Sequence, residues 1–189
     1  MSPNPRPRRM SLARKVFIAA IFLLLFPAGY VLTIWEQGNF HEITKGEAYR
    51  SAQLNRDEFE YYIKKYHIRS VLNLRGQNSG ESWYKDELKV SMDHHLVHYD
   101  IPLSATHEPD SQDVQTLLTV FREAPRPILI HCKSGADRTG LVGAMWKVIV
   151  DNEPKSEASK QLFILYGHIP IGGTSAMDRF FEKWKPALP

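Results

Sequence analysis

Apolar runs alternate with amphipathic stretches along the chain after residue 36. This pattern is typical of strands that alternate with helices. Buried strands are predicted at Ser70–Leu74 and Ile128–His131, where apolar residues predominate. Further strands are expected at Leu96–Ile101 and at Ala48–Arg50, the latter as a short edge strand. The predicted fold is therefore α/β, with a central, mostly parallel sheet of four to five strands flanked by helices.

Helices are predicted between these strands from their apolar spacing and their caps. Asn55, with a glutamate three residues later, has the capping-box signature, so a helix is expected to reach about Tyr66. Asp110 is expected to cap another helix that runs to about Glu123. The remaining helices are predicted at Ser82–Met92, Leu141–Val150, Ser156–Tyr166 and Ala176–Lys185.

Twenty residues without a charged side chain run from Val16 to Trp35. A helix of that length spans roughly 30 Å, the thickness of the hydrocarbon core of a bilayer. Five basic residues and no acidic one precede it, which places the N-terminus in the cytoplasm. We therefore expect residues 1–15 to be a basic cytoplasmic tail and residues 16–35 a transmembrane signal-anchor helix. Residues 36–189 are expected to form one extracytoplasmic domain, periplasmic if the protein is bacterial.

The rival interpretation of this segment is a cleaved signal peptide. The apolar run before Pro27 is eleven residues long, and Pro27–Gly29 could end its helix. No clear A-x-A cleavage pattern follows, however, and the apolar run resumes at Tyr30. Both interpretations place residues 36–189 outside the cytoplasm, whereas the third alternative, a buried helix of a soluble protein, does not.

Composition and charge narrow the possible partners. Of the 24 basic residues, five lie in the first fifteen positions, which leaves 19 basic residues against 21 acidic ones in the remainder. The net charge of +3 therefore reflects the tail, and it gives no argument for nucleic-acid binding by the folded part. The single cysteine, Cys132, excludes an internal disulfide framework and a cysteine-cluster metal site. We expect no cofactor and no metal.

The candidate chemistry follows the strand Ile128–His131, in the segment that leads from Cys132 into an apolar helix. Successive backbone N–H groups of such a loop form a nest for an oxyanion, and the helix N-terminus adds a partial positive charge. Cys132 is the candidate nucleophile, because the same field favours the thiolate. Arg138 lies six residues on, where its planar fork can bind two phosphate oxygens.

The other residues of this loop have expected roles as well. Gly135 allows a backbone turn that a side chain would block. Thr139 is expected to hydrogen-bond the sulfur and help it leave in a second step, and His131 to orient the loop through backbone contacts. Lys133 contacts the substrate or is a solvated charge. The predicted phosphate-binding residues are Lys133, Ser134, Gly135, Ala136 and Thr139.

The run from His131 to Thr139 resembles H-C-x5-R-[ST], the signature of the cysteine-based protein tyrosine phosphatase superfamily. Tyr49–Gln53 and Val71–Arg75 resemble two strands of its dual-specificity-type branch, so the resemblance covers roughly residues 40–180. It implies a phosphatase-like fold and metal-independent hydrolysis of a phosphate monoester through a phosphocysteine. Lys133 and the run Asp137–Gly140 are also similar to those of phosphatases that accept phosphoinositides or phosphorylated lipids.

The general acid is where the chain departs from that family. Counted back from Pro109, the position expected for the aspartate is Ala105. Asp137 is the preferred substitute, because some relatives with a G-x-D-R loop are thought to use this residue, although it could instead brace the loop. Asp110 is explained by a helix cap, and Asp100 by a hydrogen-bond acceptor on a strand. The candidate acids are Asp137, Asp110, Asp100 and Glu108.

Three functions remain open. The preferred one is a membrane-anchored, extracytoplasmic phosphatase that acts on a phosphoprotein, mainly phosphotyrosine, or on a phosphorylated lipid. The second is a phosphatase-like module that binds a phosphorylated ligand without turnover, which the missing standard acid favours. The third is a rhodanese-like sulfurtransferase, whose loop also starts with cysteine but does not need the Arg-Thr-Gly continuation. His94, His95 and His98 are interpreted as surface or core residues rather than as metal ligands.

Overall fold

The computed structural model describes residues 10–19, 21, 25, 29–30 and 37–186. The chain divides into two units, Met1–Glu36 and Gln37–Pro189. Most of the predicted anchor, residues 16–35, lies outside the described residues. Among those that are described, no helix has both the length and the apolar character needed to cross a bilayer.

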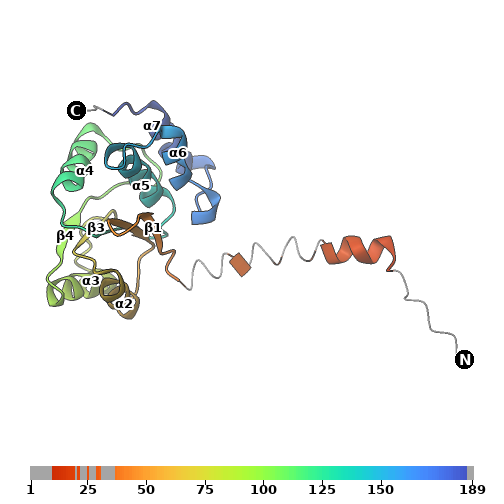
Figure 1. The fold of residues 1–189 in the computed structure, drawn as a ribbon, viewed down its shortest axis with the longest axis horizontal. Helices are drawn as coiled ribbons and strands as arrows, with labels where there is room; N and C mark the ends of the chain where they lie inside the picture. Colours follow the sequence, from red (N-terminus) through yellow and green to blue (C-terminus); the bar gives the residue numbers. More distant parts are fainter. Residues whose placement is uncertain (1–9, 20, 22–24, 26–28, 31–36, 187–189) are drawn as a thin grey trace, which may run out of the picture. The chain divides into compact units, whose positions relative to one another are not determined.

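The second unit is built on a five-stranded sheet with the order β1-β2-β5-β3-β4 (Figure 1). β1 and β2 are antiparallel, and the other neighbouring pairs are parallel. The predicted α/β class is confirmed, in the form of a mixed sheet flanked by helices. The strands are β1 (His41–Thr44), β2 (Ala48–Ser51), β3 (Ser70–Asn73), β4 (Val97–Asp100) and β5 (Ile128–His131).

The prediction of an edge strand at Ala48–Arg50 is wrong in one respect. β2 lies inside the sheet, because β1 pairs with its outer side and places Glu42 opposite Tyr49. β1 was not predicted, since its sequence His-Glu-Ile-Thr contains a single apolar residue, Ile43, which is buried. One apolar position does not make a recognisable alternating pattern.

The helices form a layer on each side of the sheet (Figure 1). α2 (Arg56–Tyr66) and α3 (Ser82–Asp93) lie on one side. The other side carries α4 (Ser111–Glu123), α5 (Asp137–Ile149), α6 (Lys155–Ala158) and α7 (Ala176–Lys183). Both predicted caps are present, since the side chains of Asn55 and Asp110 each close a capping box.

Two predicted helices differ from the structure by more than two residues. α5 begins at Asp137 rather than at Leu141, so residues 137–140, the last part of the segment that follows Cys132, form the first turn of the helix. The helix predicted at Ser156–Tyr166 is divided into α6 and two 3₁₀ turns, Ser159–Gln161 and Ile164–Tyr166. The apolar residues of this stretch therefore do not share one helical face.

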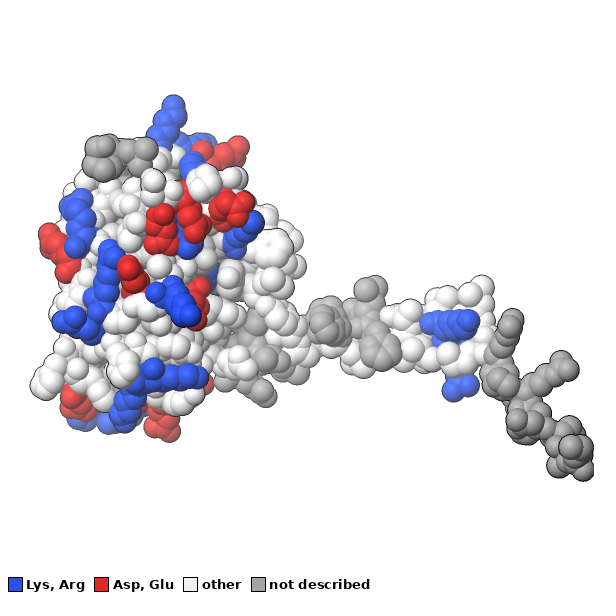
Figure 2. All heavy atoms as spheres, in the orientation of Figure 1, with Lys and Arg blue, Asp and Glu red and all other residues white. Residues whose placement is uncertain are grey.

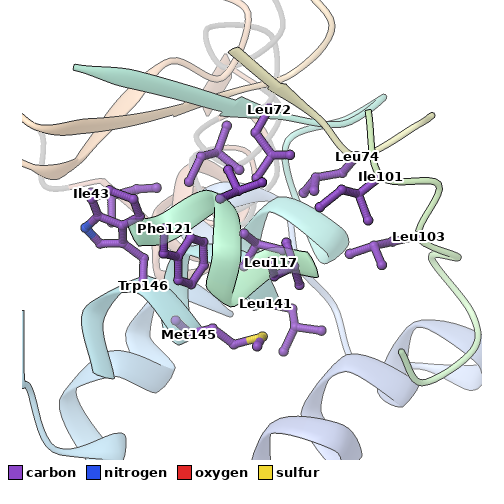
Figure 3. Packing of buried hydrophobic residues seen from close by; sticks show 14 of the residues in the cluster. Ile43, Leu72, Leu74, Ile101, Leu103, Leu117, Phe121, Leu141, Met145 and Trp146 are labelled. Carbon is purple, nitrogen blue, oxygen red and sulfur yellow. The ribbon is translucent and has the colours of Figure 1, made fainter. Parts of the chain in front are cut away.

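Alternate residues of the strands pack into two different cores. Ile128 and Ile130 of β5 belong to the cluster beneath α4 and α5, whereas Leu129 belongs to the cluster beneath α2 and α3. Figure 3 shows the first cluster, with labelled side chains that include Leu72, Leu117, Phe121, Leu141, Met145 and Trp146. Because both faces of β5 are buried, its carboxyl end is fixed in place, and the candidate loop begins there.

Candidate active site

The candidate loop joins the carboxyl end of β5 to the N-terminus of α5. Cys132 lies at its start with 1% of its surface exposed, and Asp137 begins the helix. The structure brings the predicted phosphate-binding residues together on this loop and in the first turn of α5: Lys133, Ser134, Gly135, Ala136 and Thr139. The N–H groups at a helix start have no partner within the helix, so the loop opens onto a ready anion site.

Gly135 is required by the shape of the loop. Its φ angle is +73°, a conformation that residues with a side chain rarely adopt. A Cβ atom at this position would also lie 2.7 Å from the carbonyl carbon of Ser51 and from the backbone nitrogen of Ala52. The expectation that a side chain here would block the turn is confirmed.

A buried arginine of β2, Arg50, holds the backbone of the loop from the α5 side. Its Nη2 donates to the carbonyl oxygen of Gly135 at 2.7 Å, and its Nη1 donates to both the backbone and the side-chain oxygen of Gln161 at 2.8 and 2.7 Å. The ring centre of Tyr166 lies 4.0 Å from the guanidinium. Burial lowers the pKa of Arg50 to about 10, so the side chain remains cationic at neutral pH.

This contact fixes the direction of the loop amides. In a trans peptide the C=O and the following N–H point in opposite directions. Because the Gly135 carbonyl faces Arg50, the N–H of Ala136 points away from it, toward the side on which an anion would bind. The sequence pattern predicts Arg50 as a strand residue and gives no sign of this contact, because 85 positions separate Arg50 from Gly135.

One nitrogen of the Arg138 side chain is hydrogen-bonded, and another has no partner among the described residues. Its Nη1 donates to the carbonyl oxygens of Leu74 and Leu103, both at 3.2 Å. Its Nε is buried and has no hydrogen-bond partner among the described residues, and the same holds for Oγ1 of Thr139. Buried donors are normally paired, so Nε of Arg138 marks a place for an oxygen atom of a ligand. The predicted hydrogen bond from Thr139 to the sulfur of Cys132 is not formed among the described residues. A guanidinium fixed in this way presents its fork for bidentate binding of phosphate.

A second arginine, Arg75, adds positive charge near Arg138. Its Nη1 donates to the side-chain oxygen of Gln53 at 3.1 Å, and its guanidinium lies 3.6 Å from the ring centre of Trp83. Burial, and then the positive charge of Arg138, lower the pKa of Arg75. The side chain therefore has structural partners and also strengthens the field that attracts an anion.

On the α3 side, His131, the residue before the candidate nucleophile, is paired with a buried carboxylate. Nε2 of His131 lies 3.2 Å from Oε1 of Glu87, which also meets Nε2 of His98 at 2.9 Å, while Gln53 donates to Oε2 at 2.7 Å. Burial alone would raise the pKa of Glu87, but the charge of His131 and these hydrogen bonds hold it well below its usual range. Glu87 was not among the predicted site residues; its helical spacing from the buried Tyr84 and Val90 was the available signal.

Asp137, the preferred candidate acid, is engaged by a buried histidine. Its Oδ1 lies 2.7 Å from Nδ1 of His168, and Nε2 of His168 lies 3.0 Å from Oδ2 of Asp178 on α7. Burial acts to lower the pKa of His168, but the hydrogen bonds to the two carboxylates outweigh it and raise the pKa above the ordinary value. A protonated His168 donates to both carboxylates and braces the start of α5 against α7.

The other three candidate acids have partners of their own. Asp100 lies at the end of β4, where its oxygens accept hydrogen bonds from Nδ2 of Asn73 at 2.8 Å and from the hydroxyl of Tyr84 at 2.6 Å. Asp110 caps α4. Glu108 is within 3.4 and 3.6 Å of two basic side chains of α7. Of the four candidates, Asp137 is the one next to the cysteine loop in the chain.

No group of three or more His, Cys, Asp or Glu side chains in the described part of the chain is arranged to hold a metal ion. His98 pairs with Glu87 and lies 3.6 Å from Asp100. His94 and His95 follow the end of α3.

A buried cysteine on a loop between a strand and a helix N-terminus, with an arginine six residues on, is the arrangement expected of a cysteine-based phosphatase site. Residues 34–169 match the family described as DSP-PTPase phosphatase fused to NAD+ kinase, and the chain belongs to this family of dual-specificity-type phosphatases. Its relatives are cysteine-dependent phosphatases, so the sulfurtransferase alternative is set aside.

Two curated relatives share part of this sequence. The inositol diphosphatase SIW14 of Saccharomyces cerevisiae is 30% identical over 116 residues, which cover 58% of this chain and 40% of that protein. The dual specificity protein phosphatase TpbA of Pseudomonas aeruginosa is 36% identical over 55 residues, which cover 28% of this chain and 25% of that protein. The matches thus span less than half of either relative.

Solved structures of the same two proteins share the fold. The Siw14 catalytic core superimposes with a TM-score of 0.62 at 20% identity, covering 78% of this chain and 85% of that one. P. aeruginosa TpbA gives a TM-score of 0.60 at 20% identity over the same shares. TpbA has also been solved in complex with phosphotyrosine.

Proposed function

We propose that this protein hydrolyses phosphate monoesters at Cys132, without a metal and through a phosphocysteine intermediate. The observation that carries the proposal is the buried Nε of Arg138, which has no partner among the described residues although its Nη1 is tied to two carbonyl oxygens. A donor held in that way, six positions after the buried Cys132, fits a phosphate whose phosphorus lies above the sulfur.

The reaction has two steps. The Cys132 thiolate attacks phosphorus, an S–P bond forms, and the P–O bond to the leaving group breaks. Arg138 and the loop N–H groups bind the three non-bridging oxygens throughout. Water then attacks the phosphocysteine and the S–P bond breaks. This step releases inorganic phosphate and restores the thiolate, which a hydrogen bond from Thr139 stabilises.

Asp137 is the proposed general acid. It would give a proton from Oδ2 to the leaving oxygen and recover one from the attacking water, while His168 holds Oδ1. The loss of a general acid typically slows such a step by about 10²–10⁴-fold. Esters with a poor leaving group would therefore be affected more strongly by Asp137→Asn than aryl esters.

The location is proposed from the sequence. Residues 16–35 would anchor the protein in a membrane, with the basic tail in the cytoplasm and the phosphatase domain on the far side.

The test is phosphate release from p-nitrophenyl phosphate by the full chain in detergent, with chelator present. We expect Cys132→Ser and Arg138→Ala each to lower turnover by about 10³-fold or more. The matched control is Arg56→Ala, which removes an exposed arginine of α2. A Cys132 variant that keeps most of the activity would contradict the mechanism.

A second candidate function is a module that binds a phosphorylated ligand without turnover. The observation in its favour is Ala105, which occupies the position expected for the standard acid. Binding of phosphotyrosine by the wild-type chain, with no phosphate released from any ester, would support this alternative and would refute the enzyme.

A further inference from the structure

The segment after α6 exposes large apolar side chains and buries a histidine. Within nine consecutive residues, five large apolar side chains are between about half and three-quarters exposed: Phe163, Ile164, Leu165, Ile169 and Ile171. His168, in the middle of the same segment, is 2% exposed. This arrangement inverts the usual one, in which apolar side chains face the core. We call these five residues the apolar flank.

The apolar flank is concentrated in one part of the second unit. The other exposed large apolar residues there are spread over α2, α3 and β4: Tyr61, Met92 and Val97. In Figure 2 the lobe next to α6 is largely white, with few charged side chains. Contiguous exposed apolar surface on a folded unit marks an interaction site.

Hydrogen bonds join this segment to the catalytic loop. Nδ2 of the buried Asn39 donates to the carbonyl oxygens of both Ser134 and Tyr166, each at 2.9 Å. His168 binds Asp137 at the other end of the loop. The apolar flank therefore lies beside the phosphate site, and the exposed Lys133 lies on the same loop.

The contact between Asn39 and Ser134 limits how far the site can lie from the N-terminal apolar segment. The uncharged run ends at Trp35, four positions before Asn39. Even fully extended, the chain between them spans at most about 15 Å. A bilayer that holds residues 16–35 would therefore keep the catalytic loop near its surface.

These observations favour a lipid surface as the occupant of the apolar flank, because Asn39, four positions after the uncharged run, is hydrogen-bonded to the segment that carries the exposed side chains. We propose that the apolar flank docks on the bilayer that holds residues 16–35, and that the substrate is a membrane lipid with a phosphate-monoester headgroup. This inference rests on the proposed function. Docking would direct the loop opening toward the headgroups and let Lys133 meet their negative charge.

The experiment uses the full chain in vesicles of phosphatidylcholine that contain phosphatidic acid. Phosphate release is measured from phosphatidic acid and, with the same vesicles, from soluble p-nitrophenyl phosphate. The test variant combines Ile164→Gln with Ile171→Gln, at positions that are 59% and 75% exposed. The matched control is Met92→Gln, at an apolar position 74% exposed on α3.

We expect the double variant to release phosphate from phosphatidic acid at least about tenfold more slowly, because it removes apolar contact with the bilayer. Release from the soluble ester should stay within about twofold, and the control should preserve both activities. Equal loss on both substrates, or no loss on the lipid, would overturn the inference. If wild-type protein cleaved the soluble ester but not the lipid, the lipid inference would be wrong and the proposed function would stand. If it released phosphate from neither p-nitrophenyl phosphate nor phosphatidic acid, the proposed function would be wrong as well.

A phosphotyrosine peptide distinguishes the remaining partner class. If the double variant slowed release from the peptide as much as from the lipid, the apolar flank would be a peptide-docking surface and the inference would be wrong.

Discussion

The two faces of the sheet support Cys132 with opposite charges. On the α5 face, the buried cation Arg50 is paired with oxygen atoms of the loop and of Gln161. On the α3 face, the buried anion Glu87 is paired with side chains, and it reaches the nucleophile only through His131. Arg50 therefore shapes the backbone that would bind phosphate, whereas Glu87 positions the residue that precedes the sulfur. The difference predicts a larger effect on catalysis for Arg50.

The largest effect is expected for Arg50→Met. The change leaves buried carbonyl oxygens without a donor, which should lower the free energy of unfolding by about 3–5 kcal/mol. Loss of amide orientation should also lower kcat by about 10²-fold or more. Chemical denaturation and p-nitrophenyl phosphate turnover of the full chain measure the two effects.

Arg50→Lys separates charge from geometry in the same position. It keeps the buried cation but loses the fork, so we expect stability closer to wild type while much of the loss in kcat remains. If Arg50→Lys restored full turnover, charge alone would account for the role of Arg50.

A smaller effect is expected for Glu87→Gln. The carboxyl pKa of Glu87 is depressed in the folded state, so its contribution to stability is present above the unfolded pKa of about 4.5 and is lost as pH falls below it. The variant should lose about 1–3 kcal/mol near pH 7 and should lose less further stability on acidification. Melting temperatures between pH 3 and 7 measure this, with Asp86→Asn, at an exposed position of α3, as the control. An unchanged acid dependence would contradict the ionised state of Glu87.

The smallest effect is expected for His168→Gln. The pKa of His168 is raised in the folded state, so its contribution to stability is complete below the unfolded pKa of about 6.5 and is lost as pH rises through the folded value. The melting temperature of the wild type should therefore fall more between pH 5.5 and 8.5 than that of the variant. His107→Gln, at an exposed position, is the control. Equal pH dependence in the two proteins would contradict a protonated brace.

The sequence was sufficient to predict the elements with strong local signals. The buried strands β3 and β5 and the caps Asn55 and Asp110 were predicted because their signals lie within a few residues. The start of α5 was missed, because its first turn is Asp-Arg-Thr-Gly, which has no apolar periodicity. The loop itself fixes that turn.

The supports of the site could not be predicted in the same way. Arg50 and Gly135 are 85 positions apart, and Glu87 and His131 are 44 positions apart. Each pair meets only because β2 and α3 pack against the end of β5, and a single sequence does not contain that register. The stretch that contains Ile164 was predicted to be part of a helix that ends at Tyr166. Its exposed apolar residues have the same spacing that buried residues have on a helix.

The most direct test of catalysis at Cys132 is to trap the phosphocysteine. The full chain is mixed with p-nitrophenyl phosphate, quenched with acid within the first turnovers, and digested for mass spectrometry; Thr139→Ala is run in parallel to slow breakdown of the intermediate. We expect one added phosphoryl group on the peptide that contains Cys132, more of it in Thr139→Ala, and none in Cys132→Ser. Turnover without any such adduct, or an adduct that persists in Cys132→Ser, would contradict it.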